Sequence, residues 1–220
     1  MALQDNTLLS NKPNTLETST LETLFSSIKL NDYVSNTKSN KVKDISSLSF
    51  LVKKELSHSD CIKLGTGLEK VLRDICSKST KFINIKPKNC KGQKEMDHLF
   101  ISNNDDNDDN DAKKIIIYAE FKSNINLDTE KSKATTNKIL SIIDELKIKY
   151  PEYEVNGYLV SARYYDTKLI PSLFINKYET IKKNVIGINN YLQLFGNHTF
   201  TDEQNYTDWV NELASTMFED

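Results

Sequence analysis

Cysteine, proline and glycine are scarce in this chain, which has three, four and six of them in 220 residues. The cysteines, Cys61, Cys76 and Cys90, are odd in number, lie far apart and form no metal-type spacing with a histidine, which favours a reducing compartment. With 38% hydrophobic and 27% charged residues, the composition excludes collagen-like repeats and wholesale disorder. We expect one domain with a substantial hydrophobic core.

The chain also lacks any long apolar run. No stretch approaches the roughly 20 residues that a membrane-spanning helix needs, so we predict no membrane partner. Residues 1–6 have neither the basic segment nor the apolar segment of a secretion signal. Together with the cysteine pattern, these absences predict an intracellular, cytoplasmic protein.

Arginine is rare too, and the negative charge is concentrated in one tract. The 29 basic residues, of which only Arg73 and Arg163 are arginine, stand against 31 acidic ones, for a net charge of −2. Five aspartates lie in the Asn/Asp-rich tract 103–111, and removing their charge leaves +3 for the rest of the chain. The tract does not match a calcium-binding loop that starts at Asp105, because Asn110 and Ile116 stand where such a loop needs Gly and Glu. We interpret the tract as a solvated hairpin tip, and the mild positive charge elsewhere as compatible with a nucleic-acid partner.

Hydrophobic periodicity predicts a mixed α/β fold. Helices are expected over residues 15–30, 45–56, 60–77, 128–149, 178–185, 189–195 and 202–218. Strands are expected over residues 82–85, 96–101, 114–122 and 155–161, with a turn at 88–92. The strand 114–122 is mostly apolar, which indicates a central position. This order predicts a mixed sheet with helices packed against it.

Capping residues set the expected helix starts. Asp60 is the predicted N-cap of the helix 60–77, Asp128 or Thr129 that of the long helix, and Thr201 or Asp202 that of the last helix. Residues 1–58 are expected to form a tail and a helical segment that packs on a core domain at 59–220.

Two charged side chains stand at the end of the expected central strand. The side-chain period of two puts Glu120 and Lys122 on one face, and Asp97 meets them if the strands before and after the Asn/Asp tract form a hairpin. Two neighbouring carboxylates repel each other unless a cation intervenes, and Mg²⁺ accepts one or two carboxylates together with water. Lys122 would then hold or deprotonate the attacking water and offset charge on a phosphate.

The acid-x-Lys triplet is not specific by itself. The segments Asp111-Ala-Lys113, Glu145-Leu-Lys147 and Asp166-Thr-Lys168 match it as well. Only Glu120-Phe-Lys122 also has the end of an apolar strand and an aspartate in the strand before it. The alternative is an ion pair at a strand end, with Asp97 capping a turn; the context favours the functional interpretation.

Three segments together resemble the PD-(D/E)XK nuclease superfamily. They are Gly65-Thr-Gly-Leu-Glu69, Glu95-Met-Asp97 and Tyr118-Ala-Glu-Phe-Lys122. Residues 122–131 and 187–196 are similar to segments of type II restriction endonucleases, and the resemblance covers about residues 60–196. Met96 stands where many members have proline, and the 22 residues between Asp97 and Glu120 make a long gap, which the Asn/Asp tract explains as an insertion.

The resemblance implies an α-β-β-β-α-β core with extra terminal helices, a nuclease domain at 59–220 and Mg²⁺-dependent hydrolysis of DNA phosphodiesters. It implies that Asp97 and Glu120 are metal ligands, with the backbone carbonyl of Phe121 as a possible further ligand. By the same resemblance Lys122 is the catalytic lysine, and Glu69 is the helix acid that some members place beside the metal.

Polar and basic residues after the central strand are candidates for DNA contacts. The expected DNA-contacting residues are Ser123, Asn124, Thr129, Lys131, Lys133 and Arg163. The first five lie at the entry to a helix, which suits phosphate, although ordinary capping and a solvated face explain them equally well. Arg163 is the candidate for base readout, with an ordinary surface arginine as the alternative. We expect His98 and Trp209 to serve packing.

These features predict a Mg²⁺-dependent type II restriction endonuclease that cuts double-stranded DNA as a homodimer. No nucleotide cofactor is expected, because Gly65-Thr-Gly67 lacks the Gly-Lys-Ser/Thr of a phosphate-binding loop. A repair or Holliday-junction-resolving nuclease on the same fold, a catalytically silent DNA-binding module and a general α/β interaction protein remain open as alternatives.

Overall fold

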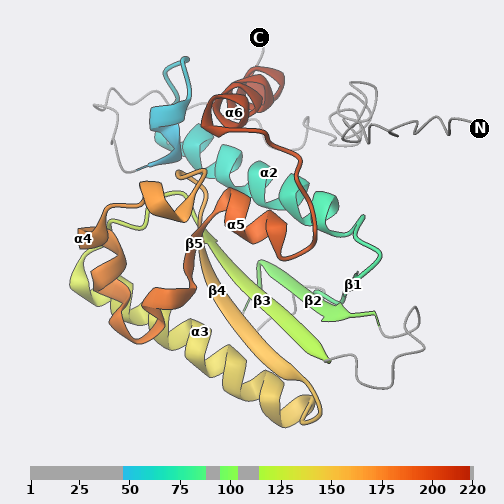
Figure 1. The fold of residues 1–220 in the computed structure, drawn as a ribbon. Coiled ribbons are helices and arrows are strands. Elements are labelled where there is room, and N and C mark those ends of the chain that lie inside the picture. Colours follow the sequence, from blue (N-terminus) through green and yellow to red (C-terminus); the bar gives the residue numbers. More distant parts are fainter. Residues whose placement is uncertain (1–46, 88–94, 104–113, 219–220) are drawn as a thin grey trace, which may run out of the picture.

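The computed structural model describes residues 47–87, 95–103 and 114–218, and within them a five-stranded mixed sheet forms the centre of the protein (Figure 1). The strands are β1 Phe82–Asn84, β2 His98–Ser102, β3 Ile115–Lys122, β4 Glu154–Ser161 and β5 Val185–Gly187, in that spatial order. β1, β2 and β3 pair antiparallel, whereas β4 is parallel to β3 and β5 is parallel to β4. The mixed α/β class and the central position of β3 are confirmed.

Helices cover both faces of the sheet (Figure 1). The helices are α2 His58–Cys76, α3 Thr129–Lys149, α4 Ser172–Ile175, α5 Ile188–Gln193 and α6 Glu203–Phe218, with 3-10 segments η2 Leu48–Leu51, η3 Thr167–Leu169 and η4 Asn176–Asn184. α2, α5, α6 and η2 enclose one hydrophobic core with the sheet, and α3 and η4 enclose the other. None of these helices combines the length and apolar composition needed to cross a membrane.

β3 contributes to both cores, which explains its nearly continuous apolar run. Ile117, Ala119 and Phe121 belong to the core under α2, α5 and α6. Ile116 and Tyr118 belong to the core under α3. The alternation therefore directs the next side chain, Glu120, toward the α3 face of the sheet.

The long helices start at hydrogen-bonding caps. Ser57 caps α2: its side chain accepts from the backbone N–H of Asp60 and donates to the Asp60 carboxylate at 2.6 Å. The prediction that Asp60 is the N-cap was therefore wrong, because Ser57 starts the helix earlier and Asp60 completes the cap from the first turn. The Asp128 cap of α3 is confirmed, and Asp202 accepts from Asn205 N–H at the start of α6.

The predictions of two helices were wrong, and in both segments tertiary contacts favour another backbone geometry. In place of a helix over 45–56, the described part contains only η2. There the Asn211 side chain of α6 accepts a hydrogen bond from the Lys53 N–H and donates one to the Leu51 carbonyl. It thus satisfies backbone groups that a continued helix would pair within itself. In place of a helix over 178–185, η4 departs from helical geometry at Tyr178, whose hydroxyl donates to the buried Ile125 carbonyl.

β5 was not expected from the sequence. This strand has three residues, Val185–Gly187, too few to show a period of two. Its last residue must be glycine, because a Cβ on Gly187 would lie 2.7 Å from the carbonyl carbon of Asp166 and 2.8 Å from the carbonyl oxygen of Tyr165. The expected helix 15–30, the turn 88–92 and all of the Asn/Asp tract except Asn103 lie outside the described residues.

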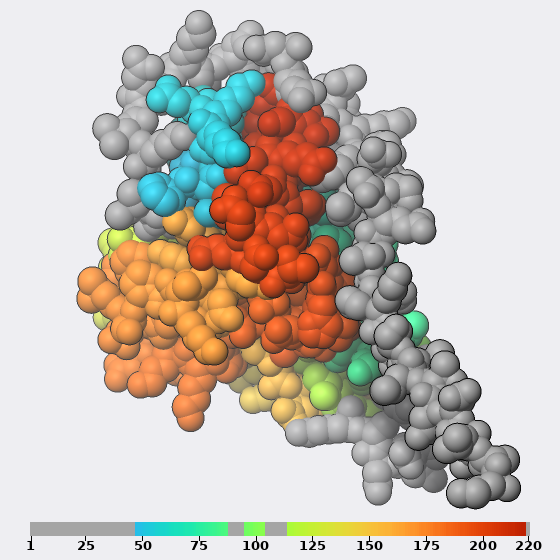
Figure 2. All heavy atoms as spheres, turned by 45° about the horizontal axis from the view of Figure 1, so that its top comes forward, coloured from blue at the N-terminus to red at the C-terminus, as the bar shows by residue number. Residues whose placement is uncertain are grey.

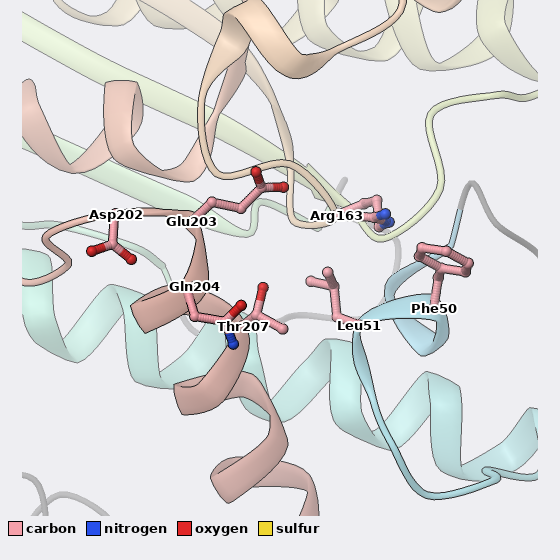
Figure 3. A pocket seen from close by; sticks show the side chains of 7 residues that line it. All are labelled: Phe50, Leu51, Arg163, Asp202, Glu203, Gln204 and Thr207. Carbon is pink, nitrogen blue, oxygen red and sulfur yellow. The ribbon is translucent and has the colours of Figure 1, made fainter.

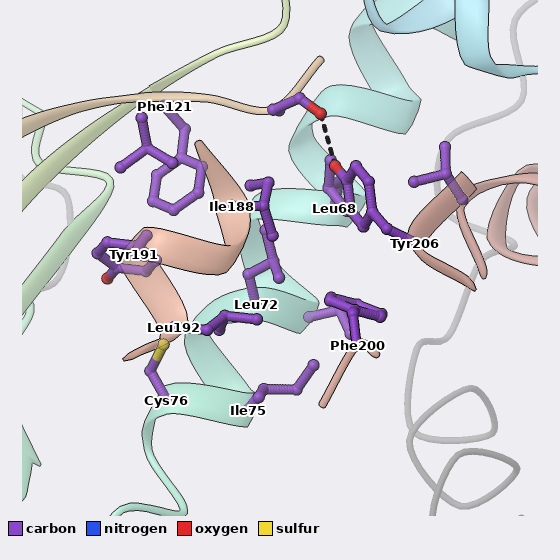
Figure 4. Close-up of a cluster of buried hydrophobic side chains, with 14 of the residues drawn as sticks. Leu68, Leu72, Ile75, Cys76, Phe121, Ile188, Tyr191, Leu192, Phe200 and Tyr206 are labelled. Carbon is purple, nitrogen blue, oxygen red and sulfur yellow. Dashed lines mark hydrogen bonds between the residues drawn. The ribbon is translucent and has the colours of Figure 1, made fainter. Parts of the chain in front are cut away.

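A buried hydroxyl ties α6 to the end of β4 (Figure 4). Tyr206 is fully buried, and its hydroxyl donates to the Ala162 carbonyl at 2.5 Å. We expect Tyr206→Phe to lower the free energy of unfolding by about 1–3 kcal/mol, because it leaves a buried carbonyl without its donor. Denaturant unfolding followed by circular dichroism measures this loss. The control is Tyr165→Phe, because the Tyr165 hydroxyl also donates to a backbone carbonyl, that of Phe200, but its ring is only half-buried. An equal loss of stability in both variants would contradict the importance of burial for the Tyr206 hydrogen bond.

Candidate active site

A buried carboxylate lies where β3 ends. The Glu120 side chain is 2% exposed, and the Lys122 Nζ lies 2.7 Å from its Oε1 atom. The Tyr118 hydroxyl, two residues earlier on the same face, donates to Oε2 at 3.0 Å. The period of two thus brings Tyr118, Glu120 and Lys122 together, as the pattern predicts for the last two.

α3 supplies a second ammonium group that sequence reasoning missed. The Lys138 Nζ lies 2.5 Å from Glu120 Oε2, so each carboxylate oxygen of Glu120 contacts a lysine. The signal for this contact is present in the helical period. Lys138 is three residues after Thr135 and four before Ile142, both buried, so it lies on the face of α3 that covers the sheet.

Asp97 joins this group from the residue before β2. Its Oδ2 atom accepts a hydrogen bond from the Phe121 N–H at 2.7 Å, so the carboxylate is tied to the backbone between Glu120 and Lys122. Burial, together with the charges of Glu120 and Glu69, raises the pKa of Asp97 to about 7. These carboxylates are therefore close enough to oppose one another's ionisation, and a cation near Asp97 would relieve the opposition.

Opposite charges set the ionisation of the central pair. Burial favours the neutral form of Glu120, but Lys122 and Lys138 outweigh it and lower its pKa. Burial would likewise lower the pKa of Lys122, but Glu120 outweighs it and the pKa is raised. Lys122 is thus an ammonium group at neutral pH, which suits holding a water molecule or a phosphate better than deprotonating water.

Glu69 reaches the site electrostatically from α2. It is half-buried and forms ion pairs with Arg73 at 3.3 Å and Lys86 at 3.6 Å. Burial raises its pKa, partly offset by these two cations. Arg73 also donates to the Asp97 carbonyl at 3.2 Å, so it connects Glu69 to the residue just before β2. Sequence reasoning missed Arg73 and Lys86 as partners of Glu69.

A buried histidine, His98, follows Asp97 and lies on the other face of the sheet. His98 Nε2 lies 2.8 Å from the Glu69 carbonyl and Nδ1 lies 2.7 Å from the Tyr191 hydroxyl. Because a carbonyl only accepts, Nε2 carries the proton and Nδ1 accepts from Tyr191. Burial lowers the pKa of His98 to about 3, so the ring stays neutral and joins the start of β2 to α2. The expectation that His98 and Trp209 are packing residues is consistent with their burial.

The expected phosphate-contacting residues lie in the loop after β3 and in the first turns of α3. Asn124 Oδ1 accepts from the Asn126 N–H at 2.7 Å, and Lys131 pairs with the capping Asp128 at 3.2 Å. Thr129 and Lys133 are exposed on α3, and Ser123 is half-buried directly after Lys122. Asn124 and Lys131 thus already have local partners, and DNA contacts by all five residues stay a prediction.

Arg163 lies in a separate pocket of about 520 Å³ between η2 and α6 (Figure 3). Its guanidinium carbon is 4.7 Å from the centre of the Phe50 ring and 5.1 Å from that of Tyr164. Asp202 and Glu203 also line the pocket, which makes it unsuited to phosphate. Figure 2 shows η2 and α6 side by side on this surface. Base readout by Arg163 stays a prediction.

The donor atoms of Asp97 and Glu120 fit a hard divalent ion. Carboxylate oxygens are the ligands that Mg²⁺ prefers, and it needs only one or two of them together with water. The described residues contain no group of three or more His, Cys, Asp or Glu side chains that could hold a metal ion. An ion here would rest on these two carboxylates and on water, with the Phe121 carbonyl as an expected further ligand, and would require at least one lysine to leave Glu120.

Comparisons of the chain with protein-family models, curated proteins and solved structures give no match. The function of the protein must therefore be inferred from the site itself.

Proposed function

We propose that this protein is a Mg²⁺-dependent endonuclease of the PD-(D/E)XK kind, built on a restriction-endonuclease-like α-β-β-β-α-β core. Its substrate is double-stranded DNA, cut at a short specific sequence as by type II restriction enzymes. The observation that carries the proposal is the buried Glu120 beside Lys122 at the end of the central strand, next to an Asp97 whose ionisation is opposed by its neighbours.

Each residue has a role in this proposal. Asp97 and Glu120 hold the ion, which when bound supplies Lewis-acid polarisation of the phosphate and lowers the pKa of its water. The hydrogen bond from Phe121 N–H orients Asp97. The Lys122 ammonium donates to the attacking water or to a phosphate oxygen and offsets the negative charge that develops there. Glu69 adds negative charge that favours a cation near Asp97.

The proposed partners follow from the substrate. The polar residues after β3 contact phosphates, and two copies of the chain related by a two-fold axis place one site on each strand of a palindrome. No nucleotide cofactor enters the reaction.

One observation favours a second candidate, a catalytically silent DNA-binding module. Both oxygens of Glu120 are already paired with lysines, and a permanent arrangement of this kind would exclude the ion. A repair or junction-resolving nuclease would share the site but require a branched or damaged substrate.

Digestion of plasmid and phage DNA separates these candidates. We expect purified protein with Mg²⁺ to produce discrete fragments that share one end sequence, and EDTA to abolish cleavage. Sequencing the fragment ends identifies the target. Cleavage of a four-way junction but not of linear duplex would favour the resolving nuclease. DNA binding without divalent-dependent cleavage of either substrate would overturn the enzyme assignment in favour of the silent module.

A further inference from the structure

Lys138 forms the shorter of the two ion pairs with Glu120, and the proposed chemistry gives it no role. Its ammonium contacts Glu120 Oε2 at 2.5 Å, and the same oxygen accepts from the Tyr118 hydroxyl. Its side chain is 29% exposed at the edge of α3, whereas Glu120 is 2% exposed. A partly exposed lysine therefore contacts a buried carboxylate.

The ammonium of Lys138 acts on both carboxylates of the site. It pairs with Glu120, and its charge also acts on Asp97, whose pKa it lowers. A divalent ion held by these two carboxylates would likewise attract both of them electrostatically. Lys138 and the ion are thus competitors for Glu120 Oε2, because two cations at one oxygen repel each other strongly in a partly buried site.

Lys138 can leave Glu120 at low conformational cost. Its ammonium stands on a flexible four-carbon stem and is partly exposed, so a rotamer change carries it outward. Among the described residues, Glu120 is the carboxylate within ion-pair distance of Lys138. A DNA phosphodiester is an anion that would receive the displaced ammonium.

We propose that Lys138 is a resident cation that holds Glu120 in the free protein, leaves when a divalent ion binds, and is stabilised in its displaced position by a DNA phosphate. This inference rests on the proposed function. It makes binding of the ion and binding of DNA mutually favourable, since each removes Lys138 from the other's path, and such coupling is reciprocal. Lys138 is here a positioning residue for the ion site.

Mn²⁺ binding, followed by electron paramagnetic resonance of the free ion, tests this without turnover. Lys138→Met keeps the stem and removes the charge, and Lys133→Met is the control on the exposed face of the same helix. Without DNA, we expect Lys138→Met to bind Mn²⁺ about tenfold more tightly than the unchanged protein. Lys133→Met should bind it equally. Adding Glu120→Gln to Lys138→Met should remove the gain, which places the ion at Glu120.

The coupling is tested by repeating the titration with a 20-base-pair duplex from an uncut stretch of plasmid. The duplex should tighten Mn²⁺ binding of the unchanged protein several-fold and that of Lys138→Met less than twofold. Equal or weaker Mn²⁺ binding by Lys138→Met, or an equal effect of the duplex on both proteins, would overturn the inference. Lys138→Gln replaces Lys138→Met if circular dichroism shows that the latter does not fold.

The two hypotheses fail separately. Plasmid digestion by the unchanged protein with Mg²⁺ decides the nuclease assignment. If that protein cleaves DNA and Lys138→Met shows no tighter Mn²⁺ binding, the role of Lys138 is wrong and the enzyme assignment stands. If no DNA is cut but Lys138→Met gains a Mn²⁺ site that depends on Glu120, the competition at Glu120 is upheld and the nuclease assignment falls.

Discussion

Without divalent ions at pH 8, Asp97→Asn protein is expected to unfold at a temperature about 4–8 °C higher than the unchanged protein. The folded protein raises the pKa of Asp97 from 3.8 to about 7, because the carboxylate is buried and faces Glu120 and Glu69. Ionised Asp97 therefore costs about 2 kcal/mol or more of folding free energy at pH 8. Asparagine removes the charge and keeps an oxygen that accepts from Phe121 N–H.

The pH dependence has a definite sign. Between about pH 4 and pH 7 the folded protein holds a proton on Asp97 that the unfolded chain has released, so this residue makes stability fall as pH rises through that window and level off above it. The advantage of Asp97→Asn should thus be small at pH 4 and largest above pH 7. Differential scanning calorimetry at several pH values measures it, with Asp144→Asn on the exposed face of α3 as the control.

Added Mg²⁺ should reverse the order of stability. The ion favours the ionised carboxylate, so it should raise the unfolding temperature of the unchanged protein at pH 8 and leave Asp97→Asn unaffected. The asparagine variant should also lose cleavage. Identical unfolding temperatures of the two proteins at pH 8, with and without Mg²⁺, would show that Asp97 is neither strained by its neighbours nor a metal ligand.

Lys122→Ala is expected to lower the rate of Mg²⁺-dependent cleavage by about 10²–10³-fold while DNA binding is retained. The variant removes the positive charge that contacts Glu120 Oε1 and that would face the phosphate. Lys138 and Tyr118 still satisfy the other oxygen of Glu120, so the fold should persist. Initial rates on plasmid DNA, together with gel-shift titrations, separate loss of chemistry from loss of binding.

The chain carries its own matched control for this variant. Glu145-Leu-Lys147 has the same acid-x-Lys spacing, but both charged residues lie exposed on α3. Lys147→Ala should cleave at the unchanged rate, because its triplet lacks a buried carboxylate and a neighbouring Asp97. Wild-type rates for Lys122→Ala, or an equal loss for Lys147→Ala, would remove Lys122 from the chemistry.

The strands and helices with repeated apolar residues were predictable from sequence. β3 has hydrophobic side chains on both faces, and α3 repeats apolar residues over many turns behind its Asp128 cap, so local pattern and final packing agree. β5 was not predictable because it has only three residues, and η2 and η4 were not because their geometry depends on partners far along the chain. Asn211 binds the backbone after η2, and Tyr178 reaches the Ile125 carbonyl.

Within the candidate site, too, the local pattern predicted some contacts and distant parts of the chain decided the others. The period of two along one strand was enough to place Glu120 and Lys122 on a common face, because neighbouring positions in a strand need no other part of the chain to define their direction. The partners from other elements, Lys138 on α3 and Arg73 on α2, depend on how helices pack across the sheet. Only the tertiary structure decided these contacts, since helix packing is set by the sum of many side-chain contacts and no single motif encodes it.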